Sequence, residues 1–329
     1  MNSLELFKTQ KFYQIDISIL KDLGYDVLLS NRIFDSLLFW KYDILFSYFY
    51  RYSFFAALLA KCFGKKTYFT GGIDSLDSDY ASAFNYKIQA LFFKLCYWVA
   101  DSCIIVSQSD LKNIFKVSSL KKKLSYSEHV INTKLFIADV PKEKIFTSIV
   151  WMGDEGNVVR KGVDKALQIF AELKKIPEFV DYRFVIIGRK GEGEVLVRSI
   201  IDKYNLKGSV ELKGEVSEED KINLLKQSKY YFQLSLYEGF GLAALEALCA
   251  NNIIIHSGKG GLANPIYKEQ LLFDIDNDFD SELLKLVNKL ACFTPITSYD
   301  NLLEYYDILR RKDDFEAIIV NGKSNYKLK

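Results

Sequence analysis

Short apolar runs and longer amphipathic segments alternate along most of the chain. Apolar runs closed by glycine or a polar turn predict strands, whereas apolar residues spaced three or four apart predict helices. The predicted strands are residues 25–29, 43–48, 66–70, 101–107, 148–152, 184–187, 210–212, 230–234 and 253–256. The predicted helices are residues 7–23, 53–63, 86–100, 163–174, 194–204, 218–227 and 242–250, with further helical segments to about residue 311.

This alternation predicts an α/β fold in which helices cover both faces of parallel sheets. It occurs twice, on either side of a polar stretch at residues 139–144 that contains Pro141. We therefore expect two Rossmann-like domains facing a cleft, the first over residues 1–140 and the second over residues 145–329. Ligands of such sheets bind beyond the carboxyl ends of the strands, so the chemistry is expected in those loops.

Composition narrows the class of protein. Of the 329 residues, 49% are hydrophobic and 26% are charged, as in soluble globular proteins. The net charge of +2 lacks the basic excess of a nucleic-acid-binding surface, so no nucleic-acid partner is expected. The five cysteines form no C-x-x-C motif, and neither His129 nor His256 lies near a cysteine pair. This pattern indicates buried thiols in a reducing compartment and no metal site. With no signal sequence and no apolar run of 18 residues, the sequence predicts a cytoplasmic protein.

The most informative segment is the turn at residues 237–248, which follows a predicted strand and opens a predicted helix. It reads Tyr-Glu-Gly-Phe-Gly-Leu-Ala-Ala-Leu-Glu-Ala-Leu. Its glycines let the backbone approach a ligand closely, and the free N–H groups of a helix start suit a phosphate. Glu238 and Glu246 are carboxylates that accept hydrogen bonds from paired hydroxyls, such as those of sugar and ribose rings. The pattern fits a nucleotide sugar. A second interpretation is purely structural, since an acidic residue stabilises a helix start by itself.

The segment resembles the signature of glycosyltransferase family 4, a family with the GT-B fold, in which two glutamates flank an E-G-F-G-L turn. Both glutamates and every residue of the turn match. The similarity runs from about Lys41 to Arg311 and is clearest from Ser148 to Pro265. The resemblance implies a retaining, metal-independent transferase without a bound cofactor, whose substrate is a nucleotide-sugar donor. The acceptor would be a glycan or a lipid-linked molecule in surface polysaccharide or glycolipid synthesis.

The resemblance also assigns roles to residues. Glu238 would contact the donor sugar and Glu246 the ribose. Backbone contacts to the sugar and the phosphates are expected from Gly239, Phe240, Gly241 and the helix start at Leu242.

Further positions match outside the turn. Lys161 would neutralise the donor diphosphate as a compact, mobile charge. Gly188 resembles the turn on the nucleotide side, and Val216 lies in a segment that resembles the one beside the base. A solvated helix start remains the alternative interpretation of Lys161 and of Arg160 before it.

Three departures from the family pattern affect the prediction. Asp154 follows the glycine after the strand at residues 148–152, where members usually carry arginine, and Arg160 is the candidate to supply that charge. Gly71 stands where many members carry a histidine, which leaves Asp74 as the nearest ionisable replacement. The chain also begins with a helical pattern, so we expect the first domain to lack its usual first strand. The catalytic candidates are therefore Glu238, Lys161 and Asp74.

Two other patterns leave alternatives open. The acidic pairs at residues 77–79 and 274–276 resemble metal-binding D-x-D motifs, but we interpret them as surface acids. The first half combines lysines at 121–123 with aromatic residues at 46, 48, 49, 50 and 52. Basic residues beside apolar surface dock on anionic lipid, which predicts a peripheral contact with the inner face of the membrane. In the alternative, the aromatic residues form core and the lysines form a solvated face.

Three functions remain compatible with the sequence. The first is a sugar transferase. The second is a non-catalytic relative that binds nucleotide sugar or serves as a partner subunit, and the third is a nucleotide-sugar epimerase on the same fold. The two glutamates favour the first.

Overall fold

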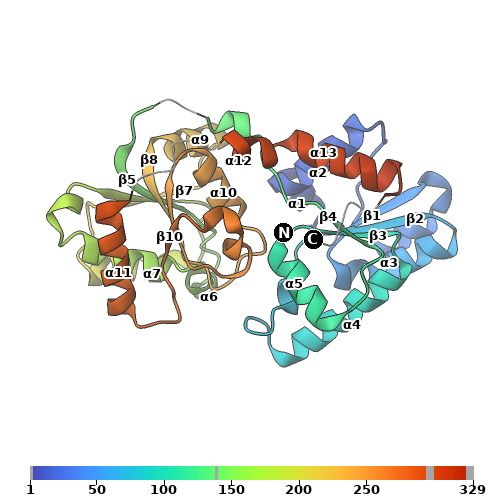
Figure 1. The fold of residues 1–329 in the computed structure, drawn as a ribbon, viewed down its shortest axis with the longest axis horizontal. Helices are drawn as coiled ribbons and strands as arrows, with labels where there is room; N and C mark the ends of the chain where they lie inside the picture. Colours follow the sequence, from blue (N-terminus) through green and yellow to red (C-terminus); the bar gives the residue numbers. More distant parts are fainter. Residues whose placement is uncertain (1–2, 138–139, 294–299, 324–329) are drawn as a thin grey trace. The chain divides into compact units, whose positions relative to one another are not determined.

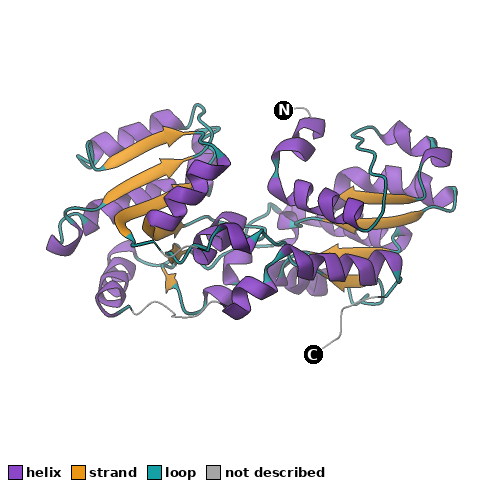
Figure 2. Ribbon diagram, turned by 90° about the horizontal axis from the view of Figure 1, so that it is seen from above, coloured by secondary structure: helices purple, strands orange, loops and turns teal. Residues whose placement is uncertain are grey.

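The computed structural model describes residues 3–137, 140–293 and 300–323. The chain divides into two compact units (Figure 1). Unit 1 comprises the described residues up to Ile131 together with those from Glu304 onward, and unit 2 runs from Asn132 to Leu303. In Figure 2 each unit shows a sheet flanked by helices, as expected of an α/β fold. None of the helices in these ranges is long and apolar enough to cross a membrane.

Unit 1 contains a parallel sheet of order β1-β2-β3-β4. Its strands are β1 (Ile44–Tyr48), β2 (Lys66–Thr70), β3 (Ser102–Ile105) and β4 (Leu124–Tyr126). Its helices are α1 (Ser3–Thr9), α2 (Lys11–Asp22), α3 (Tyr50–Cys62), α4 (Ala83–Val99), α5 (Gln108–Val117) and α13 (Ile308–Phe315), followed by a π-helix (Glu316–Val320). Short 3-10 helices occupy Ile33–Leu37, Phe39–Lys41 and Asp74–Leu76.

Unit 2 contains a parallel sheet of order β10-β9-β8-β5-β6-β7. Its strands are β5 (Glu143–Ile149), β6 (Arg183–Ile187), β7 (Val210–Gly214), β8 (Ser228–Gln233), β9 (Ile253–His256) and β10 (Leu271–Leu272). Its helices are α6 (Glu155–Arg160), α7 (Val163–Leu173), α8 (Glu194–Lys203), α9 (Glu218–Gln227), α10 (Leu242–Cys249) and α11 (Phe279–Cys292), and α12 (Asp300–Tyr305) leads back to unit 1. Its 3-10 helices are Thr133–Leu135, Pro177–Phe179, Gly260–Ala263 and Pro265–Tyr267.

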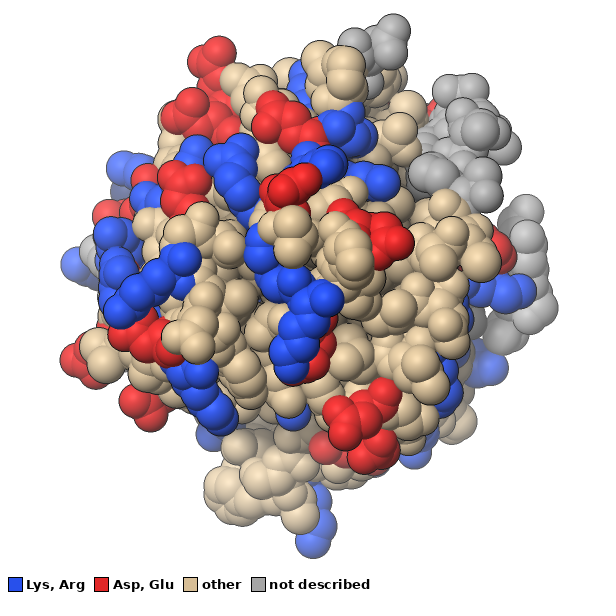
Figure 3. All heavy atoms as spheres, turned by 90° about the vertical axis from the view of Figure 1, so that its left-hand side faces the viewer, with Lys and Arg blue, Asp and Glu red and all other residues tan. Residues whose placement is uncertain are grey.

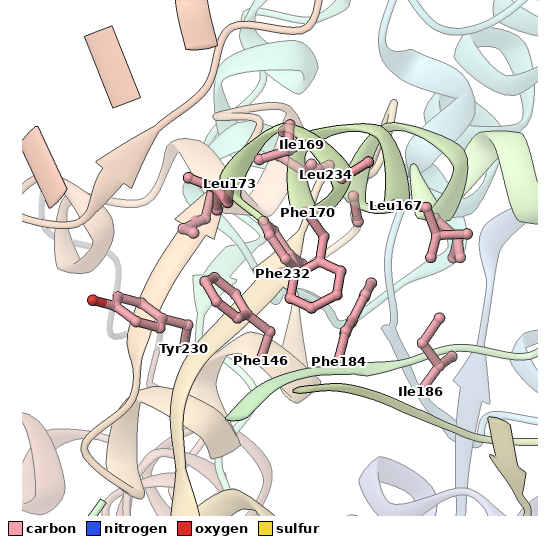
Figure 4. Close-up of a cluster of buried hydrophobic side chains, with 14 of the residues drawn as sticks. Phe146, Leu167, Ile169, Phe170, Leu173, Phe184, Ile186, Tyr230, Phe232 and Leu234 are labelled. Atoms are coloured by element: carbon pink, nitrogen blue, oxygen red, sulfur yellow. The ribbon is translucent and has the colours of Figure 1, made fainter. Parts of the chain in front are cut away.

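The core of unit 2 explains why the central strands are so apolar. Phe146, Phe184 and Phe232, from three neighbouring strands, are fully or almost fully buried and face Leu167 and Phe170 of α7 (Figure 4). A parallel strand covered on both faces reads as a continuous apolar run. This packing fixes the carboxyl ends of β5, β6 and β8, from which the functional loops emerge.

The end of the chain returns to unit 1, which differs from the expected second domain of residues 145–329. Arg311 on α13 is fully buried and donates to both carboxylate oxygens of Asp16 on α2, at 2.7 and 2.9 Å. Its guanidinium also donates to the backbone oxygens of Ser127 and Glu128. Because a buried charge without its partner costs several kcal/mol, this pair holds α13 in unit 1. In Figure 1, α13 lies beside α2.

Two strand predictions differ from the structure. The strand predicted at residues 25–29 is wrong, because that segment joins no sheet ladder. Tyr25 and Val27 pack on the core of unit 1, whereas Leu28 is 66% exposed. The strand predicted at 148–152 begins earlier, at Glu143, since two charged residues at its entry are solvated while Ile145 and Phe146 are buried. Asp139, part of the expected boundary, lies outside the described residues.

Candidate functional site

The glycine turn at residues 238–241 joins β8 to α10 as expected. Gly241 is the N-cap of α10 and has a φ of 88°, a left-handed conformation that favours glycine. A second glycine segment packs directly on this turn: the backbone N–H of Gly261 donates to the Glu238 carbonyl oxygen at 2.6 Å. Side chains at Gly260 or Gly261 would collide with the backbone of the turn. The turn is therefore fixed from both sides.

The Glu238 carboxylate lies at the centre of a polar cluster. Its Oε1 atom is 2.5 Å from the Lys161 ammonium nitrogen and also accepts from Gln233 Nε2 at 2.8 Å and Ser235 Oγ at 2.7 Å. The side chain of Lys161 is 23% exposed and that of Glu238 is 13% exposed. Two predicted residues, 77 positions apart in sequence, are thus brought together in a partly buried ion pair, where the local dielectric strengthens charge interactions.

Lys161 reaches this cluster because of the chain reversal between α6 and α7. Gly162, the N-cap of α7, has a φ of 67°. A β-carbon there would overlap the carbonyl of Leu234. The Leu236 N–H donates to the Arg160 carbonyl oxygen at 2.8 Å, which joins this reversal to the loop after β8.

Asp154, at the position where members carry arginine, and Arg160, the candidate to supply that charge, both hydrogen-bond within α6. Asp154 is the N-cap of α6, where its side chain accepts from the Asn157 N–H at 2.6 Å. The guanidinium of Arg160 donates to the Asn157 side-chain oxygen, at 2.7 and 3.3 Å. Arg160 is thus bonded within its own helix, and its part in donor binding stays a prediction.

Glu246 lies in the second turn of α10 and is only 7% exposed. Lys221 on α9 contacts both of its carboxylate oxygens, at 2.9 and 2.8 Å, and also Glu218 at 3.0 Å. Burial lowers the pKa of Lys221, but the two glutamates outweigh it, and the net pKa is raised. Lys221 therefore stays charged and pairs with both carboxylate oxygens of Glu246.

A pocket of about 370 Å³ opens beside these elements. It is lined by Ile187 at the end of β6, Val216 in the loop before α9, and polar residues of β7 and α9. The polar lining residues are Lys213, Asp220, Asn223 and Gln227. Gly188 follows Ile187 with a φ of 131°, and its N–H donates to the Gly214 carbonyl oxygen at 2.8 Å. The predicted positions Gly188 and Val216 are therefore close to this pocket.

The remaining turn residues occupy the expected places. Phe240 is 7% exposed, whereas Gly239 and Leu242 are half-buried at the start of α10. Their backbone N–H groups include those that a helix start leaves without intrahelical partners.

Asp74 belongs to unit 1 and is the exposed first residue of the 3-10 helix after β2. Gly71 before it has a φ of 104°, so a histidine at this position would be strained. Burial lowers the pKa of His129 well below its usual value and that of His256 to about 4. Both imidazoles are therefore neutral at neutral pH.

The acidic pairs form turns. Asp77 accepts from the backbone N–H groups of Asp79 and Tyr80, and Asp274 accepts from that of Asp276. Within residues 3–137, 140–293 and 300–323, no three metal-ligating side chains come together.

Behind Asp74, a fully buried carboxyl makes stability depend on pH. Burial, and then the charges of Asp74 and Asp77, raise the pKa of Asp110 to about 8, although Ser107 and the Ile73 N–H lower it. Between about pH 4 and pH 8 the unfolded chain binds fewer protons here than the folded chain, so stability falls as pH rises through this window. We expect Asp110→Asn to remove this loss and to gain about 5 kcal/mol at pH 8 but only about 1 kcal/mol at pH 4.5.

Urea unfolding at the two pH values measures this effect. The exposed Asp22→Asn is the control and should change stability by only a few tenths of a kcal/mol at both. An Asp110→Asn gain that is equal at both pH values would contradict the raised pKa.

The sequence did not predict the groups that hold the two glutamates. Gln233 and Ser235 orient Glu238, and Lys221 binds Glu246. One signal was present: Gln233 is a polar residue at the end of an apolar strand, and it is 5% exposed. Such a residue needs a buried partner.

Part of the second unit matches a family model. Residues 156–291 match the model described as "Glycosyl transferases group 1". The chain is 30% identical over 179 residues to the GDP-mannose:cellobiosyl-diphosphopolyprenol alpha-mannosyltransferase of Xanthomonas oryzae pv. oryzae (strain PXO99A), covering 46% of this chain and 45% of that one. It is 30% identical over 105 residues to one subunit of the human phosphatidylinositol N-acetylglucosaminyltransferase, covering 32% and 21%. It thus spans less than half the length of either relative.

Solved structures share the fold over most of the chain. Anabaena Alr3699/HepE in complex with UDP-glucose matches with a TM-score of 0.69 and 12% identity, covering 93% of this chain and 88% of that one. Sucrose-phosphate synthase from Thermosynechococcus elongatus matches with a TM-score of 0.62 and 18% identity, covering 95% and 77%. The predicted two-domain α/β fold of the GT-B class is confirmed.

Proposed function

We propose that this chain, whose residues 156–291 match the model of the glycosyl transferases group 1, moves a sugar from a nucleotide-sugar donor to a glycan or lipid-linked acceptor. The observation that carries the proposal is the pair of lysine-bound carboxylates, Glu238 and Glu246, one before and one within the first turns of α10. In this proposal Glu238 contacts the donor sugar and Glu246 the ribose. Lys161 and the start of α10 hold the diphosphate. The base lies in the pocket beside Val216.

The chemistry follows from where charge develops. The bond between the anomeric carbon and the diphosphate oxygen breaks, and a bond from that carbon to the acceptor oxygen forms. The diphosphate gains negative charge, which the Lys161 ammonium and the N–H groups of α10 stabilise. Because Gly71 stands where many family 4 members carry a histidine, the leaving phosphate takes the acceptor proton in this proposal, and Asp74 is the alternative base. The family 4 resemblance supports retention at the anomeric carbon without a metal.

The relatives support a lipid-linked acceptor. One is named for transfer to a cellobiosyl-diphosphopolyprenol, and the other for transfer to phosphatidylinositol. In both names the acceptor contains a lipid. By this analogy the product is a glycolipid or a lipid-linked precursor of a surface polysaccharide.

A panel of nucleoside diphosphates and their sugars tests the proposal. Binding is measured by calorimetry, and turnover by release of the nucleoside diphosphate in wild type, Glu238→Gln and the exposed control Glu178→Gln. We expect Glu238→Gln to keep nucleotide affinity within about threefold and to lower release by about a hundredfold. The control should match wild type in both. If no nucleotide sugar binds, the proposal is wrong.

A non-catalytic binding or partner subunit is the second candidate. Gly71 in place of a histidine and the N-capping Asp154 in place of an arginine favour it. The same panel separates the two functions: binding of a donor without release or transfer, even with lipid-linked acceptors, would support the second.

A further inference from the structure

Helix α4 carries an exposed stripe of alternating apolar and basic residues. Phe84, Leu91 and Trp98 are 71%, 55% and 71% exposed, and Lys87 and Lys94 lie between them and are also exposed. The spacing of three and four residues places all five on one face of the helix. We call these residues the α4 stripe. It extends over about 21 Å of the helix axis.

The stripe is unusual because the opposite face of α4 already forms core. Phe93, Cys96, Tyr97 and Val99 are buried and pack in the main cluster of unit 1. Single exposed apolar residues are common on protein surfaces. An aligned row of large apolar residues indicates a surface that binds a membrane or another protein. Removing three such side chains from water is favourable by several kcal/mol of transfer free energy, roughly 1.5 to 3 kcal/mol for each when fully buried.

The charge of this region identifies the kind of partner. No aspartate or glutamate occurs between residues 80 and 100, and none occurs in α3, which packs beside α4. By contrast, the face shown in Figure 3 has basic and acidic side chains intermixed. A surface with large apolar side chains, interleaved lysines and no acid is complementary to an anionic phospholipid bilayer. Tryptophan and phenylalanine are suited to the headgroup boundary.

Two of the lysines at 121–123 make contacts within unit 1. The Lys123 ammonium donates to the carbonyl oxygens of Trp98 and Tyr97, at 2.8 and 3.3 Å, and so binds the last turn of α4. Lys121 lies over the ring of Phe115, 4.7 Å from its centroid. Of the aromatic residues that suggested a lipid contact, Tyr50 is buried, whereas Tyr52 is 77% exposed.

We propose that the α4 stripe docks unit 1 on an anionic phospholipid bilayer, with Phe84, Leu91 and Trp98 inserted at the headgroup boundary and Lys87 and Lys94 on lipid phosphates. This inference goes beyond the proposed sugar transfer and does not depend on the donor site, because all of its residues lie in unit 1. Docking would bring the enzyme to the surface that holds a lipid-linked acceptor.

Vesicle sedimentation tests the proposal, with the full chain and vesicles of phosphatidylcholine alone or mixed with phosphatidylglycerol. We expect binding to the mixed vesicles that weakens as salt is raised. The variant Lys87→Gln/Lys94→Gln should lose about twenty-five-fold in partition, roughly fivefold for each lysine. The variant Phe84→Ser/Leu91→Ser/Trp98→Ser should lose binding almost completely. The control Lys203→Gln/Lys207→Gln, on exposed lysines of unit 2, should bind like wild type.

The wavelength of tryptophan emission distinguishes docking from unfolding, because insertion into lipid shifts it to the blue and unfolding shifts it to the red. Trp98 is one of three tryptophans, and its emission should shift to the blue on mixed vesicles. Trp98→Phe should keep the binding and lose most of the shift. Nucleotide binding by unit 2, measured in every variant, separates failure of docking from failure of the donor site.

Two outcomes would overturn the proposal. One is vesicle binding by the triple serine variant equal to that of wild type. The other is no vesicle binding by wild type together with a concentration-dependent dimer that the triple serine variant abolishes. In that second case the stripe binds another copy of the chain.

Discussion

Lys161→Met is expected to lower turnover of the donor by about a thousandfold, the largest loss among single substitutions in the site. Lys161 supplies the cation nearest to Glu238, at 2.5 Å. If the diphosphate binds at the start of α10, this ammonium faces the charge that develops as the bond to the sugar breaks. Methionine replaces the apolar stem of lysine up to Cε, so packing around Gly162 is retained while the charge is lost.

The substitution should also leave the site with a net negative charge before the donor binds. With Lys161 present, the Glu238 carboxylate is neutralised by an ammonium and oriented by Gln233 and Ser235. Without it, a carboxylate that is only 13% exposed remains and repels the incoming diphosphate. Nucleoside diphosphate affinity should therefore fall about tenfold to a hundredfold, whereas affinity for the nucleoside alone should stay within about twofold.

The double variant Lys161→Met/Glu238→Gln separates these two effects. Removing the carboxylate as well should restore much of the nucleoside diphosphate affinity but none of the turnover, because the catalytic cation is still absent. Lys161→Arg should retain binding better than turnover, since the guanidinium keeps the charge but changes its geometry. The exposed Lys268→Met serves as the control. Turnover of Lys161→Met within tenfold of wild type would refute the assigned role.

The fold could be predicted from sequence wherever burial leaves a periodic pattern. β2, β9 and α9 have the predicted bounds because their apolar residues alternate cleanly with turn residues. The strand predicted at residues 25–29 has the same local pattern. A strand also needs a neighbouring strand whose backbone N–H and C=O groups can pair with it, and the local sequence does not show whether such a neighbour exists. The position of α13 depends on the Arg311–Asp16 pair, 295 residues apart in sequence. No local signal reveals such a contact.

The candidate site divides in the same way. The glycine turn and its two glutamates are contiguous in sequence, so their type and spacing could be read directly. Lys161 could be found only through the family resemblance, and in the structure its ammonium contacts Glu238. Lys221 could not be predicted as a site residue, because in the sequence it is one of several charged residues on a predicted surface helix. Its side chain is 13% exposed and reaches Glu246 because α9 and α10 pack against each other.

The last expected result concerns that pair. Lys221→Met should raise the donor KM by about thirtyfold with a smaller effect on kcat, because it leaves the nearly buried Glu246 carboxylate without its cation. Lysine contacts to both carboxylate oxygens still leave lone pairs for ribose hydroxyls, since a carboxylate accepts about four hydrogen bonds. The cation therefore holds the Glu246 side chain in place while the ribose binds, and Lys221 acts as a positioning residue.

A double-mutant cycle with Glu246→Gln measures the coupling. Each single variant should lose more than half of the donor-binding free energy that the double variant loses. The resulting coupling energy should be about 1 to 3 kcal/mol. The ratio of affinities for nucleotides with ribose and with 2′-deoxyribose is measured in each variant. A change in packing alone would not alter this ratio. Wild type should prefer the ribose form by about tenfold or more, and Glu246→Gln should lose that preference. An undiminished preference in Glu246→Gln would place the ribose elsewhere and leave Lys221 with a role in stability alone.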